Sequence, residues 1–139
     1  MIILDTNVLS EPLRATPAAR VSAWIDAQAI ETLYLTTVSL AEIRYGIRAL
    51  PEGRRDMLHE RFEDEVVPLF TGRILAFDER ATAYYATLRA RARANGRAIG
   101  DFDAVIASIA ASRDVIVATR DTGPFIAARV AVINPFEAR

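Results

Sequence analysis

Short apolar runs alternate along this chain with longer segments whose apolar residues recur every three or four positions. Five runs predict strands, at residues 2–4, 33–36, 74–77, 115–119 and 130–133, and the fourth gives the strongest strand signal. Strands of this kind, separated by helices, are typical of βα units around a parallel sheet. The pattern therefore predicts an α/β fold with a central parallel β-sheet flanked by helices.

Capping and breaking residues set the expected bounds of the helices. Helices are expected to begin at or just after Asn7, Pro17, Ser39, Asp78 and Asp101. Residues 54–69 carry apolar side chains at helical spacing and are expected to form one helix. Asn95-Gly96 is a typical C-terminal cap, and Gly123-Pro124 predicts a turn.

The composition narrows the function classes. With 139 residues, 52% of them hydrophobic, and a net charge of -1, the chain predicts one domain spanning residues 1–139. It contains no Cys and no Lys, which excludes disulfides, thiolate chemistry, a P-loop lysine and a Schiff base. The single His59 lies on a charged helical face and has no predicted role. There is no membrane-length apolar run and no signal peptide before the first strand, so we expect a cytoplasmic protein without a membrane partner.

Four acidic residues are expected near the carboxyl-terminal edge of the predicted sheet. Asp5 and Asp121 follow predicted strands, and Glu42 and Asp103 lie in the first turns of predicted helices. Ligands of open α/β sheets bind at the carboxyl ends of the strands. We therefore expect these four carboxylates to converge.

Each acid also has a purely structural explanation. Asp5 can cap the helix after it, Asp121 can shape a turn, and Ser39 with Glu42 can form a capping box. The four positions together favour the functional interpretation, because the acids recur at the carboxyl ends of strands or in the helices that follow them.

Asp101 competes with Asp103 for the third position. Either carboxylate could serve a site while the other interacts with the helix dipole. Asp103 is favoured because it shares a face with Ala107 and Ala110, which lets the helix approach the sheet closely. A heavier apolar face, including Phe102, is expected to pack into the core.

Converging carboxylates need a cation. Four of them without one would repel each other and raise each other's pKa. Mg²⁺ or Mn²⁺ resolves this, because hard divalent cations take oxygen ligands. Acids and metal without His, Lys or Cys suit metal-assisted hydrolysis of a phosphodiester by water.

Three arginines are candidate substrate contacts because they lie close to the acids in sequence: Arg44, Arg97 and Arg120. Solvated surface arginine is the alternative for each. The series Arg89, Arg91, Arg93 and Arg97 is likewise typical of a solvent-exposed helix face.

Five segments resemble a known family. They are LDTNVLSEPLR (residues 4–14), SLAEIRYG (39–46), DAVIAS (103–108), VATRDTG (117–123) and VINPF (132–136). Together they resemble PIN-domain ribonucleases and, more narrowly, the VapC/FitB-like toxins of bacterial toxin–antitoxin pairs. The resemblance covers essentially the whole chain, in order and without large gaps.

This resemblance implies a PIN fold whose acidic pocket binds Mg²⁺ or Mn²⁺. The implied metal-site and catalytic residues are Asp5, Glu42, Asp103 and Asp121, supported by Thr6, Asn7 and Thr119. It also implies cleavage of RNA, inhibition by a DNA-binding antitoxin, and a homodimer. Apolar side chains of the early helices could form a groove for an antitoxin helix, although core packing explains them equally well: Leu9, Leu13, Trp24 and Ile25.

Other functions were weighed against this one. A housekeeping PIN-type RNA-processing nuclease would share all these residues. An aspartyl-phosphate receiver or phosphatase would also place Asp at the end of a first strand. The missing Lys opposes both of these, and Asn7 stands where a phosphatase would need a second Asp. A binding module with structural acids would show no response to metal.

Overall fold

The computed structural model describes residues 1–137, in which five strands form one parallel sheet. The order across the sheet is β3-β2-β1-β4-β5, so the first strand of the chain lies in the middle. The strands are β1 (Ile2–Leu4), β2 (Leu33–Thr36), β3 (Ile74–Leu75), β4 (Ile116–Ala118) and β5 (Val132–Ile133). The expectation of a central parallel sheet is confirmed.

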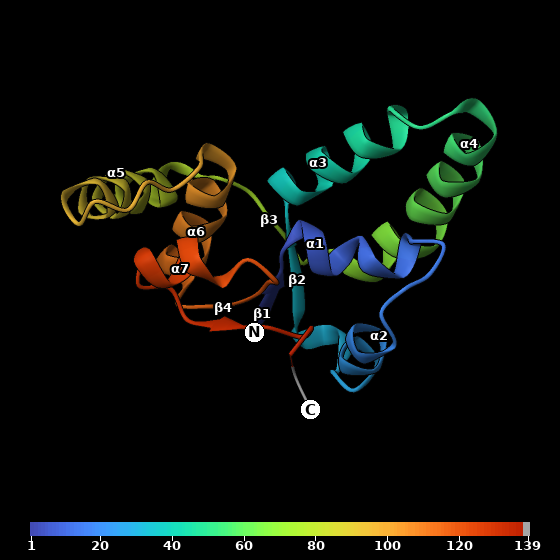
Figure 1. The fold of residues 1–139 in the computed structure, drawn as a ribbon, viewed down its shortest axis with the longest axis horizontal. Coiled ribbons are helices and arrows are strands. Elements are labelled where there is room, and N and C mark those ends of the chain that lie inside the picture. Colours follow the sequence, from blue (N-terminus) through green and yellow to red (C-terminus); the bar gives the residue numbers. More distant parts are fainter. Residues whose placement is uncertain (138–139) are drawn as a thin grey trace.

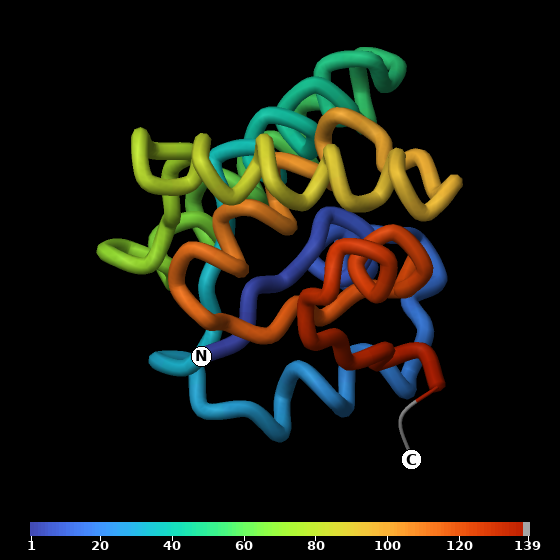
Figure 2. The backbone as a smooth tube through the Cα atoms, turned by 90° about the vertical axis from the view of Figure 1, so that its left-hand side faces the viewer, coloured from blue at the N-terminus to red at the C-terminus, as the bar shows by residue number. Residues whose placement is uncertain are grey.

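Helices cover both faces of the sheet (Figure 1). On one side lie α5 (Glu79–Ala94), α6 (Asp101–Arg113) and α7 (Thr122–Ala127). On the other lie α1 (Thr6–Leu9), α2 (Ala19–Asp26), α3 (Thr37–Arg48) and α4 (Glu52–Arg61). Seen from the α5 side, the backbone of α5 lies across that of α6 (Figure 2). No helix within residues 1–137 is both long enough and apolar enough to cross a membrane.

Two hydrophobic clusters hold the layers together. Ile3 and Val117 face one side of the sheet, where Ile106 of α6 packs. Leu4 and Leu35 face the other side. Neighbouring residues of β1 are buried on opposite faces of the sheet. A shift of register by one residue would therefore exchange the side chains that pack on the two faces. The short strands are therefore fixed chiefly by packing from both sides.

The start of α3 differs from the expectation. The helix begins at Thr37, and the residue that caps it is Thr36, whose hydroxyl accepts a hydrogen bond from the backbone N–H of Ser39 at 3.1 Å. The alternative considered for Ser39 and Glu42, a capping box, is therefore not formed. Thr36, three residues before Ser39, satisfies this backbone donor, and the Glu42 side chain instead accepts from the hydroxyl of Thr6.

Three other expectations need correction. Residues 54–69 are not one helix, because α4 ends at Arg61 and is followed by a π-helical turn (Phe62–Val66) and a 3₁₀ turn (Val67–Phe70). Gly123-Pro124 is not an isolated turn but lies in the first turn of α7, where a proline lacks only an N–H that would have no helical partner. Phe102 is exposed at 59% and is not part of the core.

The N-terminal cap of α3 gives a test of this local structure. Thr36→Val keeps the shape of the buried side chain but removes the oxygen that accepts from Ser39. We expect the free energy of unfolding to fall by about 1–2 kcal/mol. Thr37→Val, at an exposed neighbouring position, is the matched control. Equal urea midpoints for the two variants would contradict this assignment of the cap.

Candidate active site

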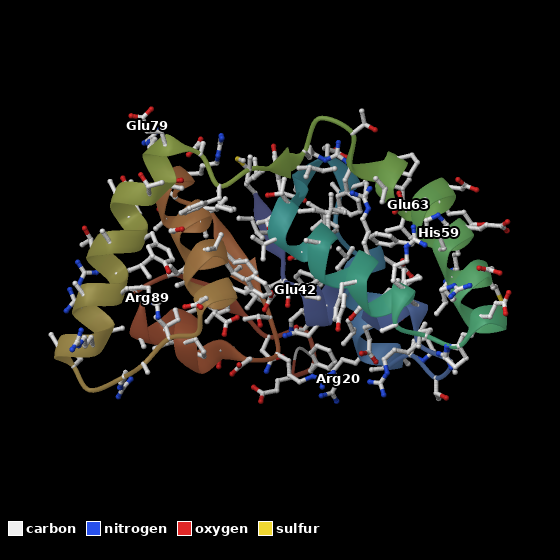
Figure 3. All side chains as sticks on the ribbon, turned by 90° about the horizontal axis from the view of Figure 1, so that it is seen from above. Arg20, Glu42, His59, Glu63, Glu79 and Arg89 are labelled. Atoms are coloured by element: carbon white, nitrogen blue, oxygen red, sulfur yellow. The ribbon has the colours of Figure 1, made fainter. Side chains whose placement is uncertain are left out.

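The carboxyl ends of three neighbouring strands bring distant polar residues together. Leu4 of β1 pairs with Ala118 of β4, and the N–H of Asp5 donates to the carbonyl of Ala118 at 2.9 Å. Asp5 therefore lies beside Thr119, the first residue after β4. Figure 3 looks down on this edge and shows Glu42 between α6 and α3. The lone His59 lies on α4, well away from Glu42 (Figure 3).

Asp5 is buried and fully engaged by hydrogen bonds. One carboxylate oxygen accepts from the N–H of Thr6 at 2.8 Å and so caps α1, while the other accepts from the hydroxyl of Thr119 at 2.8 Å. Burial raises the pKa of Asp5, these two hydrogen bonds oppose the rise, and the charge of Asp121 adds to it. The capping explanation is thus correct, and it is compatible with a place in the site.

The three residues expected to support the acids contact them or each other. The Thr6 hydroxyl donates to Glu42 at 2.7 Å. The Asn7 side-chain amide donates to the Asp5 carboxylate at 3.4 Å and to the Thr119 hydroxyl at 3.3 Å. Thr119 in turn accepts from the N–H of Asp121 at 3.1 Å. These contacts link the end of β1, α1, α3 and the segment after β4.

Asp103 lies in the electrostatic field of the other three acids. Its burial, together with the charges of Asp5, Asp121 and Glu42, raises its pKa to about 6. The charge contributions of Asp5, Asp121 and Glu42 indicate that the four carboxylates share one region of the molecule, since charges on separate faces are screened by solvent. The structure therefore brings together the four acids that the sequence singled out.

The competition between Asp101 and Asp103 is decided by their neighbours. Asp101 is exposed, and its carboxylate accepts from Arg89 at 2.6 Å on the side of α5. Asp103 is half-buried and sits against Gly100, where an added Cβ would lie 3.9 Å from its carboxylate. The charges of Asp5, Asp121 and Glu42 act on the pKa of Asp103, after its burial.

Two arginines expected near a substrate are held by other carboxylates. Arg44 forms a two-pronged ion pair with Glu63, with distances of 2.8 and 3.1 Å. Arg120 lies 3.5 Å from Glu11 and stacks on the ring of Phe136 at 4.0 Å. Neither therefore presents a free guanidinium to a substrate in this structure. Arg97 is exposed and lines a cavity beside the end of α5.

Glu11 was missed by the sequence reasoning. It is only 2% exposed, accepts from the N–H of Ala18 at 2.9 Å, and pairs with Arg14 and Arg120. A charged residue between the apolar Leu9 and Leu13 was the available signal, because a buried carboxylate needs partners. Through Arg120 it fixes the residue next to Asp121.

The donor chemistry of the site fits a hard divalent cation. Within residues 1–137 none of the four acids forms an ion pair, although five other carboxylates do. Hydroxyl and amide oxygens lie among them. However, no three Asp, Glu or His side chains of the described chain are gathered tightly enough to hold an ion as they stand. This spread agrees with mutual repulsion, and a cation would need to draw the carboxylates inward by side-chain rotation.

The fold and this edge define an α/β protein with an unneutralised acidic site. The PIN domain family model matches residues 2–131. The chain is 50% identical over 137 residues to toxin FitB of Neisseria gonorrhoeae, covering 98% of this chain and 99% of that protein. It is 51% identical over 138 residues to VapC ribonuclease Y4jK of Sinorhizobium fredii, covering 99% of each.

A solved structure agrees with these relatives. The structure of FitAB bound to an IR36 DNA fragment matches with a TM-score of 0.96 and 48% identity, covering 100% of this chain and 98% of that one. The chain belongs to the PIN-domain family, in its VapC/FitB-like group.

Asp103 makes stability depend on pH in a predictable direction. Because its pKa rises from 3.8 to about 6 on folding, the folded state binds more protons between these values, and stability falls as pH rises through them. Without metal, Asp103→Asn should therefore be more stable than the wild type at pH 7.5, by about 1 kcal/mol for this half-exposed group. The difference should vanish near pH 4.

The measurement is thermal or urea unfolding in EDTA at several pH values. Asp101→Asn is the matched control, two residues earlier in the same helix, and should show no gain in stability. A gain for Asp101→Asn, with none for Asp103→Asn, would reverse the assignment of these two residues.

Proposed function

We propose that this protein is a metal-dependent endoribonuclease and the toxin of a toxin–antitoxin pair. The observation that carries the proposal is the group of four carboxylates at one sheet edge, which have no ion-pair partners among residues 1–137. Burial and the charges of the other three acids raise the pKa of Asp103. The names of the relatives support it, because one is a VapC ribonuclease and another is the toxin FitB.

The proposed metal ligands are Asp5, Glu42, Asp103 and Asp121. Mg²⁺ or Mn²⁺ would supply Lewis acidity toward a phosphate oxygen and toward the attacking water. The chain itself orients the ligands: Thr119 and the N–H of Thr6 fix the Asp5 carboxylate, and the Thr6 hydroxyl fixes Glu42. Asp121 is positioned by its N–H contact with Thr119. The products expected from attack by water are a 5′-phosphate and a 3′-hydroxyl.

The proposed partner is an antitoxin that closes the same site. A groove of about 300 Å³ runs from Glu42 and Thr6 along apolar side chains of α3 and the turn after α1, including Ile43, Ile47 and Leu13. An amphipathic segment of a partner fits such a groove. The FitAB complex with DNA supports this proposal. Leu9 is instead buried in the core, and Trp24 and Ile25 are half-buried. A homodimer remains part of the proposal.

Cleavage of RNA tests the proposed activity. The wild type should cleave with Mg²⁺ or Mn²⁺ and not with EDTA. Asp5→Asn should lose more than the roughly 10–100-fold that removal of an outer partner of a metal site costs, and Thr119→Val, which removes such a partner, should lose about 10–100-fold. Asp26→Asn, at an exposed position, is the control. Cleavage that persists in EDTA or survives Asp5→Asn would refute the proposal.

Metal binding should also be visible without activity. Because a cation would bind only the folded pocket, Mn²⁺ at about 100 times its Kd should stabilise the fold by about 2.7 kcal/mol, and the melting temperature should rise with metal concentration. Asp103→Asn should reduce this rise, whereas Asp101→Asn should leave it intact. A melting temperature that is the same in EDTA and in millimolar Mn²⁺ would argue for acids with a purely structural role.

A further inference from the structure

A second, basic cavity lies beside the acidic edge. It has a volume of about 620 Å³ and is lined by the last turns of α5 and the loop that leads to α6. Three arginines surround it: Arg89, Arg93 and Arg97. Its floor includes Ile99, which is only 4% exposed and belongs to the hydrophobic core. The cavity is therefore a hollow in the surface whose floor is part of the hydrophobic core.

The backbone that carries Arg97 is fixed by the end of α5. The N–H of Gly96 donates to the carbonyl of Arg93 at 3.0 Å, and the N–H of Arg97 donates to the carbonyl of Ala92 at 2.8 Å. Gly96 has a φ of +68°, a left-handed conformation that favours glycine. These two hydrogen bonds fix the backbone of Arg97 against the last turn of α5.

The arginines differ in their neighbours. Arg89 donates to the hydroxyl of Tyr85 and to Asp101, both at 2.6 Å, and so forms a rigid wall of the cavity. Arg93 and Arg97 are exposed, and neither forms an ion pair within residues 1–137. By contrast, Arg44 and Arg120 are already neutralised. Arg93 and Arg97 therefore bring two guanidinium groups without ion pairs, among residues 1–137, to this cavity.

The cavity adjoins the acidic edge through the start of α6. Arg89 contacts Asp101 in the first turn of α6, two residues before Asp103. Gly100, directly after the lining residue Ile99, packs against the carboxylate of Asp103. Figure 3 shows Arg89 on α5, across α6 from Glu42. A strand of nucleic acid whose backbone is cut at the acids would pass the N-terminus of α6 to reach this cavity.

We propose that Arg93 and Arg97 form a phosphate-binding subsite that holds the RNA backbone beside the bond to be cleaved. This inference rests on the proposed nuclease function. Four carboxylates repel a polyanion, so a substrate needs cationic contacts outside the metal site. Arginine suits this role, because its planar guanidinium grips phosphate with two donors and keeps its charge at every physiological pH.

The experiment measures binding of a fluorescein-labelled single-stranded RNA to the full chain by anisotropy, in EDTA to prevent hydrolysis. Arg93→Ala and Arg97→Ala should each weaken binding about 5-fold and reduce the slope of log affinity against log salt by about 0.7. The double variant should combine both effects. Arg80→Ala, at the opposite end of the same helix and also exposed, is the matched control and should bind as the wild type does.

Kinetics with metal separate this subsite from the chemical step. For the double variant KM should rise while kcat stays unchanged, because the contact lies away from the reacting bond. If wild type and double variant bind RNA equally, the subsite is refuted, whether or not RNA is cleaved. If the wild type binds but never cleaves, and the double variant fails to bind, the subsite is supported and the nuclease proposal fails.

Two further outcomes would overturn the subsite. Arginines in a last helical turn also stabilise the helix dipole. A double variant that melts at lower temperature but keeps its RNA affinity and salt slope would show that role alone. Equal losses of affinity for RNA and for polyglutamate would show a site for any polyanion, without preference for phosphate.

Discussion

Repulsion between carboxylates at one sheet edge is the constraint around which this molecule is organised. The parallel pairing of β1 with β2 and β4 places Asp5 beside Thr119 and turns α3 and α6 toward the same edge. Hydrophobic packing on both faces of the sheet holds this arrangement against the repulsion. Burial, together with the charges of Asp5, Asp121 and Glu42, raises the pKa of the Asp103 carboxyl to about 6. Carboxylates held close together in this way attract positive charge.

The distribution of arginine follows from the same constraint. Every basic side chain is a guanidinium, so any of them could neutralise the acids permanently. Separate carboxylates prevent this: Glu63 holds Arg44, and the buried Glu11 holds Arg120. Asp101 does the same for Arg89. Among residues 1–137, the four acids of this edge are thus left without a basic side chain paired to them.

The sequence predicted the sheet and the four acids because both depend on local pattern: apolar runs define strands, and acids at strand ends are visible in one dimension. It failed where a side chain's partner comes from elsewhere in the chain. Nothing local says that Arg44 is held by a glutamate in a π-helical turn. Glu11 was overlooked because burial is a tertiary property. Metal and substrate roles remain predictions at these positions.

The hydrogen bond from Thr119 to Asp5 joins residues 114 positions apart in the chain. During synthesis the middle strand of the sheet is therefore made first, but its neighbour β4 emerges among the last segments. Contacts that close such long loops form late and slowly. A nascent chain consequently carries Asp5 and Glu42 for most of its time on the ribosome without an assembled pocket. Any activity of that pocket therefore requires the segment after β4 as well as the first strand.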